Sequence, residues 1–180
     1  MKKQMKNMTM TEKQLLFIEH IRDSQGILFR ISAVYAPDEA SRKDLRQNIL
    51  LQLWRSYATF RDQSLFSTWM YRVALNTAMM YQRKQKNHLL TVPIEDVPQL
   101  ISEINPIADS DDVQLLYRCI QELPKLDRAV ILLKLEQKSY QEISDVTGIS
   151  ESNVSVRLVR IKQKLRTLLE EKGYKGNNDE

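Results

Sequence analysis

The stretch of sequence that decides the fold runs from residue 140 to residue 160 and reads Tyr140-Gln-Glu-Ile-Ser-Asp-Val-Thr-Gly-Ile-Ser-Glu-Ser-Asn-Val-Ser-Val-Arg-Leu-Val-Arg160. A first apolar series at helical spacing stops at Gly148, where a tight turn needs the positive φ that glycine adopts without steric cost. Ser150 can cap a second helix, which has its own apolar stripe. The stretch therefore predicts the helix-turn-helix of a DNA-reading protein. The apolar residues are Tyr140, Ile143 and Val146 in the first helix and Val154, Leu158, Ile161 and Leu165 in the second.

The other face of this second helix is polar and cationic. Between Ser152 and Leu168 there are five basic residues and no acidic one. Hydroxyl, amide and cationic groups of this kind suit base edges and phosphates. A helix pair that closes a small bundle, with a basic face that is only solvated, remains the alternative at this point. The candidate DNA-binding residues are Ser152, Asn153, Ser155, Arg157 and Arg160.

Composition indicates an all-α protein. The 180 residues include only four glycines and five prolines, and 42% of them are hydrophobic. Good helix formers dominate the rest, and no strand pattern is evident. A chain of this length can bury one medium core or two small ones, so two compact helical domains are plausible.

Charge is distributed unevenly around a modest net value of +4. Every charged side chain from residue 63 to residue 94 is basic, whereas residues 87–112 contain six acidic side chains and no Lys or Arg. Three prolines within 88–110 exclude a single helix there, which predicts a flexible acidic linker between two helical domains. The expected divisions are a basic tail at 1–10, a domain at 11–87, the linker at 88–110, the helix-turn-helix domain at 111–172 and a tail at 173–180.

Several classes of function are disfavoured, because the residues that they require are absent from the chain or far apart in the sequence. Cys119 is the only cysteine, and His20 and His88 are far apart with no nearby nucleophile. The glycines form no phosphate-binding loop and the carboxylates show no metal spacing. We therefore expect no enzyme activity, no cofactor and no metal. No apolar run is long enough to cross a membrane, so we expect no membrane insertion and a cytoplasmic location.

Three helices are expected in the first half of the chain before residue 60. Thr11 opens the first, and Gly26 separates it from a second that Pro37 ends. In the third, from about Ser41 to Tyr57, Arg46 points toward the core side, which requires its stem to lie along the edge of the helix. The core face of that helix is expected to be Leu45, Ile49, Leu50, Leu53, Trp54 and Tyr57, and the opposite face Asp44, Gln47, Asn48, Leu51 and Arg55.

The segment from Phe60 to Lys86 mixes aromatic and basic residues and leads into a helix that Ser67 can cap. Bases stack on aromatic rings while their backbone attracts cations, so the mixture suits unpaired nucleic acid. Aromatic residues at helical spacing are also common in cores, and that reading stays open. We expect Trp69, Val73 and Met80 to pack inward, and Arg72, Asn76, Met79 and Arg83 to share a separate face, with Lys84 in the basic end of the helix.

Taken in order, these segments resemble the small two-domain sigma factors of bacterial RNA polymerase, the extracytoplasmic-function group. The resemblance is carried by Asp44-Leu-Arg-Gln47 through Trp54, by Phe66-Ser-Thr-Trp-Met-Tyr-Arg-Val-Ala with Asn76, and by Leu123-Pro124 before the helix-turn-helix. It covers about residues 24 to 170, and it is specific because two independent motifs occur in the expected order. The family usually has an apolar residue in place of Arg46.

The resemblance implies a function for each segment. Members bind core RNA polymerase and direct it to promoters without catalysing a reaction, and the first domain recognises and melts the minus-ten element while the second reads the minus-thirty-five element. Their protein partners are the clamp helices of the largest polymerase subunit, the flap of the second-largest subunit and an anti-sigma factor. The implied residues are Asp44, Gln47, Leu51 and Trp54 for polymerase, Arg72, Asn76, Arg83 and Lys84 for the minus-ten element, and Ser152, Asn153, Ser155, Arg157 and Arg160 for the minus-thirty-five element.

Two other functions fit parts of the sequence. A dimeric helix-turn-helix repressor with a ligand-sensing N-terminal domain would bind operator DNA but not core polymerase. A structural helical adaptor would bind only proteins, and its basic helix would be incidental.

Overall fold

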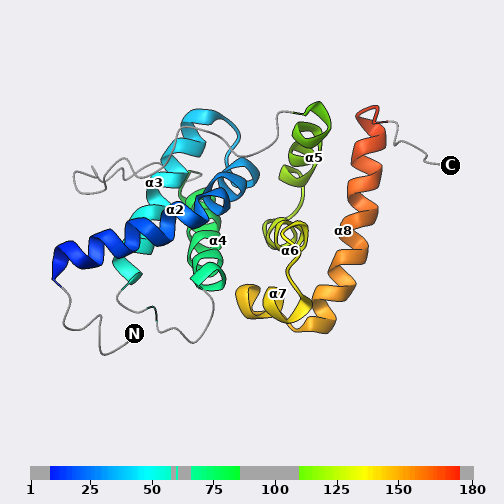
Figure 1. Cartoon of the computed structure of the whole chain (residues 1–180). Coiled ribbons are helices and arrows are strands. Elements are labelled where there is room, and N and C mark those ends of the chain that lie inside the picture. The colour runs from blue at the N-terminus through cyan, green and yellow to red at the C-terminus, as the bar shows by residue number, and fades with distance from the viewer. Residues whose placement is uncertain (1–8, 58–59, 61–65, 86–109, 175–180) are drawn as a thin grey trace. The chain divides into compact units, whose positions relative to one another are not determined.

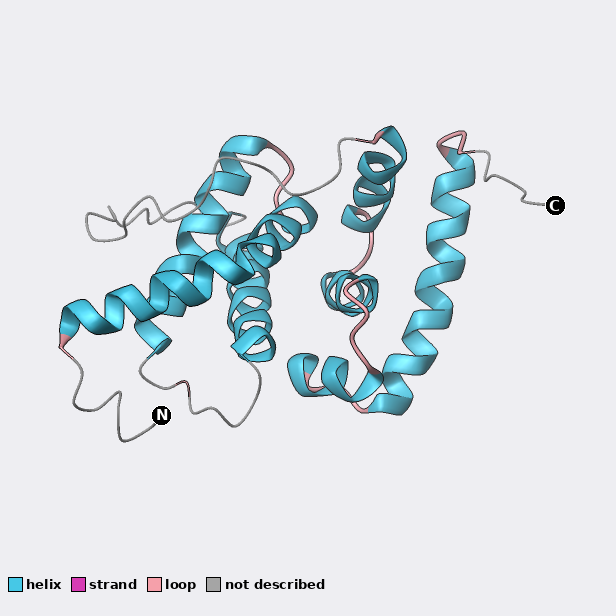
Figure 2. Cartoon of the chain, in the orientation of Figure 1, coloured by secondary structure: helices cyan, strands magenta, loops and turns pink. Residues whose placement is uncertain are grey.

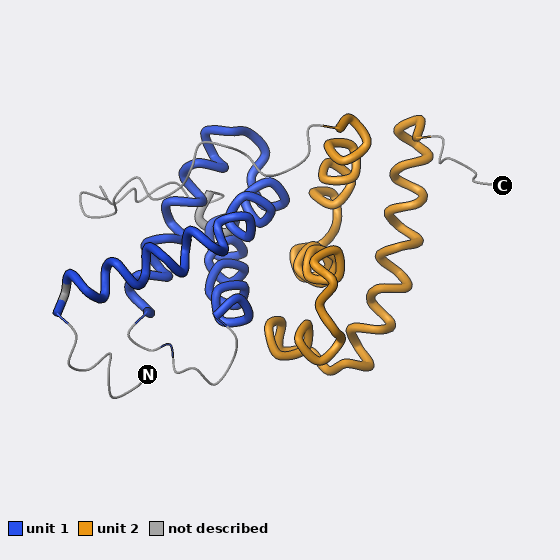
Figure 3. The backbone as a smooth tube through the Cα atoms, viewed as in Figure 1, with its two compact units in different colours: residues 1–106 blue, residues 107–180 orange. Residues whose placement is uncertain are grey.

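The computed structural model describes residues 9–57, 60, 66–85 and 110–174, without the side chains of Met10 and residues 83–85. The described residues form seven α-helices and no strand, which confirms the all-α fold (Figure 2). The chain divides into two compact units, residues 1–106 and residues 107–180 (Figure 3). The expected tails and the acidic linker at 88–110 fall largely outside the described residues.

Unit 1 is a three-helix bundle of α2 (Met10–Tyr35), α3 (Glu39–Tyr57) and α4 (Phe66–Gln85). Each helix packs against the other two, and α2 crosses both of its partners (Figure 1). The interior is apolar, as a small helical core requires. Its most deeply buried residues include Ile21, Leu28, Ile31, Leu45, Ile49, Leu53, Met70 and Leu75.

The expectation of two helices before Pro37 is wrong, because α2 is continuous through Gly26. It begins earlier than expected, with Thr9 and Glu12 in a reciprocal capping box in which the Thr9 N–H donates to the Glu12 carboxylate over 2.7 Å. A glycine inside a helix costs about 1 kcal/mol relative to alanine. That cost is small beside the apolar burial on either side of Gly26, and the helix continues until it ends before Pro37.

The expected core face of α3 is confirmed except at Trp54, which is half-buried. Two expectations for α4 are wrong. The helix begins at Phe66, so Ser67 lies within the first turn and cannot be its N-cap. Met80 is 58% exposed, because the buried face of α4 is rotated toward Ala74 and Ala78.

Unit 2 consists of α5 (Asp111–Gln121), α6 (Lys125–Leu135), α7 (Tyr140–Thr147) and α8 (Glu151–Glu171). The long helix α8 packs against the other three, which follow one another along one side of it (Figure 1). Tyr140 was expected to face the core, but it is 39% exposed and the Lys134 ammonium lies 5.4 Å from its ring centroid. Among the described residues, none of the helices has the length and apolarity needed to cross a bilayer.

Candidate nucleic-acid interface

Both ends of α7, including its turn into α8, are fixed by local hydrogen bonds. The Ser139 N–H donates to the Glu142 carboxylate over 2.8 Å, and the Glu142 N–H donates back to the Ser139 hydroxyl over 3.2 Å. The bond from the Ser139 backbone, with a smaller contribution from Lys138, lowers the pKa of Glu142 below its usual value. Gly148 then ends α7 with φ at 77°, its N–H donating to the Ser144 carbonyl over 2.8 Å. The predicted turn is therefore confirmed together with the reason for its glycine.

The second helix of the motif, α8, is anchored by its apolar stripe. Val154, Leu158, Ile161 and Leu165 are all buried, as expected, and Leu168 extends the stripe by one further turn. Ser150 caps the helix by accepting a hydrogen bond from the Asn153 N–H over 3.4 Å. This anchoring leaves the opposite face of the first three turns of α8 open to solvent.

The candidate residues on α8 are not equally exposed. Ser152, Asn153 and Arg160 face solvent, and Ser155 is half-buried at the edge of the stripe. Arg157 is also half-buried, because its Nη1 donates to the Asp127 carboxylate of α6 over 2.6 Å. A guanidinium has five N–H donors, so this ion pair leaves others for a phosphate or a base. Asp127 was not singled out in the sequence, since it lies 30 residues away from Arg157.

Two apolar side chains stand among these polar groups. Val156 is 50% exposed and Val159 is 67% exposed, on the side of α8 opposite the buried stripe. Neither valine was among the predicted DNA-binding residues, all of which are polar. Val156 lies four residues from both Ser152 and Arg160, and Val159 lies three residues after Val156, so helical spacing could have revealed both.

On α4, Arg72 and Asn76 are exposed and four residues apart, so they share a face of the helix. Met79, expected on the same face, is half-buried. The helix includes Arg83 and Lys84, whose side chains are outside the described residues. The described part of this face thus offers one cation and one amide to a ligand.

An aromatic cluster joins the first turn of α4 to α2 and α3, and it is formed by Phe17, Trp54, Tyr57, Phe60, Phe66 and Trp69. The Trp69 ring lies 5.3 Å from both Phe60 and Phe66, and the Trp54 ring lies 5.1 Å from Phe17. Both tryptophans are half-buried, so each packs in the cluster and also presents an edge to solvent. The two readings of this segment, core and stacking surface, are therefore compatible.

The outer face of α3 is more covered than expected. Gln47 is exposed, but Asp44 and Leu51 are half-buried. The Asp44 carboxylate accepts a hydrogen bond from the Asn48 amide over 3.2 Å, which ties two members of this face together. Asp44, Gln47 and Leu51 still form one continuous surface at helical spacing.

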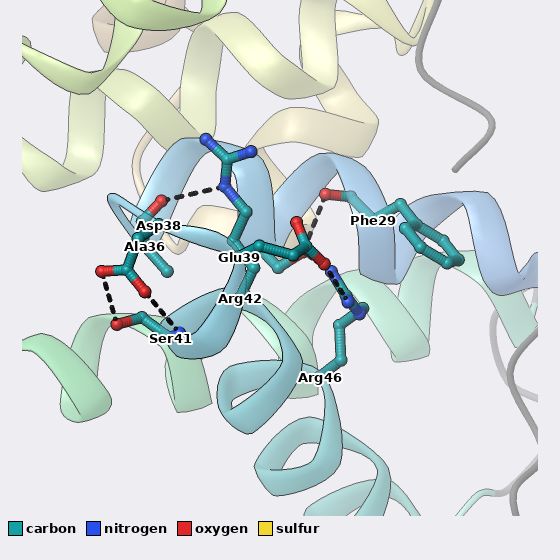
Figure 4. A network of polar contacts seen from close by, with 8 residues as sticks. Phe29, Ala36, Asp38, Glu39, Ser41, Arg42 and Arg46 are labelled. Atoms are coloured by element: carbon teal, nitrogen blue, oxygen red, sulfur yellow. Dashed lines mark hydrogen bonds and ion pairs between the residues drawn. The ribbon is translucent and has the colours of Figure 1, made fainter. Parts of the chain in front are cut away.

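Arg46 faces the core, as expected, and Figure 4 shows how its charge is satisfied. Its Nη2 lies 2.6 Å from the Glu39 carboxylate, and its Nη1 donates to the Ser32 hydroxyl over 3.3 Å. The guanidinium also lies over the Phe29 ring, 4.7 Å from its centroid. Arg46 therefore connects α3 to α2 and takes no part in the outer surface of α3.

The turn before α3 supports this arrangement (Figure 4). The Asp38 carboxylate accepts hydrogen bonds from the Ser41 N–H over 2.8 Å and from the Ser41 hydroxyl over 3.0 Å. The backbone bond is the main cause of the lowered pKa of Asp38. The Arg42 Nε donates to the Ala36 carbonyl over 3.3 Å, so the turn is held from both ends.

A helix-turn-helix with a cationic second helix, joined in one chain to an aromatic-rich three-helix unit, defines a two-domain DNA-binding protein of transcription. The family model of sigma-70 region 2 matches residues 16–88, and that of sigma-70 region 4 matches residues 113–165. Within the described residues, no cluster of three or more His, Cys, Asp or Glu residues could hold a metal ion.

Curated relatives match most of the chain. It is 30% identical over 157 residues to the RNA polymerase sigma-E factor of Streptomyces coelicolor, covering 84% of this chain and 85% of that protein. It is 26% identical over 162 residues to the RNA polymerase sigma factor SigV of Bacillus subtilis, covering 88% of this chain and 93% of that one.

Two solved structures share the fold. One is CnrH in complex with the cytosolic domain of CnrY, with a TM-score of 0.62, 21% identity, and coverage of 88% of this chain and 90% of that one. The other is the sigma factor RpoE of Bartonella quintana in complex with the anti-sigma factor NepR, with a TM-score of 0.59, 20% identity, and coverage of 89% and 96%.

The chain belongs to the extracytoplasmic-function group of bacterial RNA polymerase sigma factors. As a sigma factor it binds core RNA polymerase and promoter DNA and directs promoter-specific transcription, so the resemblance inferred from the sequence is confirmed. The repressor alternative is not favoured. Sigma factors in general are not enzymes.

Proposed function

We propose that the domain at 11–87 grips core polymerase through α3 and opens the minus-ten element through α4, while the domain at 111–172 reads the minus-thirty-five element through α8. The observation that carries this assignment is the face of α8 whose charged residues are all basic. The caps at Ser139, Gly148 and Ser150 fix the position of this helix. A basic helix held at a fixed angle behind a tight turn is the geometry that enters a major groove.

The polymerase contact is assigned to Asp44, Gln47, Leu51 and Trp54. Three of these share the outer face of α3, and Trp54 lies beside them in the aromatic cluster. A small apolar patch ringed by polar groups is typical of the centre of a protein interface. The clamp helices of the largest subunit are the proposed partner of this face, and the flap of the second-largest subunit is the proposed partner of the second domain.

Melting of the minus-ten element is assigned to Arg72, Asn76, Arg83 and Lys84 on α4. Each base that stacks on an aromatic side chain contributes about 1 to 3 kcal/mol, and cations retain the backbone of the open strand. The half-buried edges of the aromatic cluster lie near the start of this helix, where an unpaired base could stack. Binding energy alone would hold the strands apart, and no catalytic residue is required.

Reading of the minus-thirty-five element is assigned to Ser152, Asn153, Ser155, Arg157 and Arg160. Ser152, Asn153 and Arg160 are exposed on the first turns of α8, which is the part of a recognition helix that contacts base edges. Arg157 would keep its ion pair with Asp127 and offer its remaining N–H groups to a phosphate. The pair would then set the position of the guanidinium before DNA arrives.

We further propose that the protein acts in the cytoplasm and is held inactive by an anti-sigma factor. One structural neighbour, RpoE, was solved with the anti-sigma factor NepR, and another, CnrH, with the cytosolic domain of CnrY. The acidic linker at 88–110 would serve as a tether between the domains.

Transcription with purified core polymerase on a promoter library tests the function directly. The wild-type chain should select a discrete set of promoters, and Asp44→Ala with Gln47→Ala should abolish association with core polymerase while leaving the helical CD spectrum unchanged. Gln52→Ala, an exposed change on the same helix outside the assigned face, serves as the control. Retained core association by the double variant in a pull-down would remove the α3 assignment.

A further inference from the structure

The exposed valines of α8 have no structural role in the described unit. Val156 and Val159 are 50% and 67% exposed and lie away from the buried stripe of the helix. Valine is a weaker helix former than the lysine, glutamine and arginine residues at the exposed positions from Arg160 to Arg166. Neither burial nor helix stability therefore accounts for an apolar pair on this face.

Charge indicates what covers this pair. The valines stand between Ser152 and Arg160, and no acidic residue occurs from Ser152 to Leu169. A surface that carries only positive charge is complementary to the phosphates on both sides of a DNA groove. An apolar patch inside such a surface would therefore meet the floor of the groove.

In the major groove, thymine is distinguished by its C5-methyl group, which is the apolar group among the base edges. Val156 and Val159 are three residues apart, so they lie about 4.5 Å from each other along the helix axis. Successive base pairs are stacked roughly 3.4 Å apart. Two valines at this spacing match the methyl groups of thymines at neighbouring base pairs.

We propose that Val156 and Val159 are specificity-determining residues that read thymine methyl groups in the upstream promoter element. This inference rests on the proposed function of α8 and adds an apolar component to its polar contacts. Ser152 and Arg160, which flank the valines, would hydrogen-bond to the adjoining base edges and phosphates. Val156 and Val159 thus favour thymine at positions where hydrogen bonds alone would not distinguish it from other bases.

The test uses deoxyuridine, which has the hydrogen-bonding groups of thymidine and lacks the methyl group. Each thymine of the upstream element of a promoter selected by the reconstituted polymerase is replaced singly, and binding of the holoenzyme is measured by competition. With the wild-type chain, one or two adjacent replacements should lower affinity, by about fourfold for each lost methyl contact. Val156→Ala and Val159→Ala should each remove the sensitivity at one position.

Matched variants separate methyl reading from general weakening. Val159→Thr retains one γ-methyl group and should keep much of the sensitivity to deoxyuridine. Arg166→Ala, at an exposed position on the same helix, should weaken binding to thymine and deoxyuridine promoters equally. Because both valines are exposed and alanine is the better helix former, the alanine variants should melt at or above the temperature of the wild type.

The outcomes distinguish this inference from the function on which it rests. If the wild-type chain selects no promoter with core polymerase, both are overturned. If it selects promoters but all deoxyuridine replacements are neutral, or the upstream element lacks thymine, only the methyl reading is overturned. The same holds if the valine variants keep the full sensitivity, or if they change only self-association measured by sedimentation.

Discussion

The turn between α7 and α8 in unit 2 is defined by local caps, whereas the contact between α2 and α3 in unit 1 depends on residues farther apart in the sequence. Ser139 starts α7, Gly148 ends it and Ser150 starts α8, each through a bond that spans three or four residues. In unit 1, Arg46 reaches back 14 residues to Ser32. The difference indicates that the turn of the helix-turn-helix is encoded locally, while the packing of α2 and α3 behind the proposed polymerase face depends on contacts between the helices of the bundle.

The largest predicted loss of stability comes from a cavity in the core of unit 2. Leu158→Ala removes a buried side chain from α8 and should cost unit 2 about 2 to 5 kcal/mol. Both tryptophans lie in unit 1, so tryptophan fluorescence follows that unit and far-UV CD follows both. In urea, the part of the CD transition that reports unit 2 should move to a lower urea concentration in the variant. The fluorescence transition of unit 1 should not move, and it serves as the internal reference. A shift of less than about 1 kcal/mol would mean that α8 is not held by its stripe.

Substitutions of Arg46 should change the stability of unit 1, which is measured by tryptophan fluorescence during unfolding in urea. Arg46→Ala should destabilise unit 1 by about 1 to 3 kcal/mol, through lost packing of the side-chain stem and lost hydrogen bonds. Arg46→Met should stay within about 1 kcal/mol of the wild type, because methionine keeps most of the apolar stem and the Glu39 carboxylate left behind is exposed to water. Glu39→Ala is the matched control and should cost about 1 kcal/mol or less, since Glu39 is 69% exposed.

Equal destabilisation by Arg46→Ala and Arg46→Met would contradict this account. It would mean that the charge of Arg46, and not its volume, supports the contact between α2 and α3.

The same contrast explains which features could be predicted from the sequence. The turn at Gly148 and the stripe on α8 follow from residue types at short spacing, and both were predicted. The continuity of α2 through Gly26 was not, because tertiary packing overrides the local preference of one glycine. The start of α4 was misplaced by two residues for a different reason, since several polar residues near it could have capped a helix.

The candidate sites show the same limit. The exposure of Ser152, Asn153 and Arg160 follows from a helical wheel and was anticipated. The ion pair of Arg157 with Asp127 could not be, because the two residues lie on different helices and sequence spacing does not reveal which side chains meet. The half-burial of Leu51 could not be predicted either, because the burial of a residue on an outer helix face depends on how neighbouring helices cross.

Gly148→Ala tests how far the turn depends on backbone conformation alone. A β-carbon at this position would meet nothing within 4 Å, so the only cost is the positive φ of 77°. That cost should be about 1 to 2 kcal/mol for alanine and smaller for asparagine, which tolerates left-handed backbone better. CD-monitored urea unfolding of the two variants measures the difference. Equal stability of Gly148→Ala and the wild type would show that the turn relaxes to another conformation.

The smallest effect should be a pH dependence of the α7 cap. The pKa of Glu142 is lowered in the folded protein by the Ser139 N–H and by Lys138, so its carboxylate stabilises the fold above the unfolded value of 4.5. Folding stability from this group is lost as the pH falls through the lowered folded pKa. Glu142→Gln can keep the capping box without a charge. The stability difference between wild type and variant, measured by CD melting, should therefore favour the wild type at pH 7 and shrink steadily below pH 4.5. A difference that stays constant down to pH 3 would show that the cap acts through shape and hydrogen bonding with no contribution from the charge.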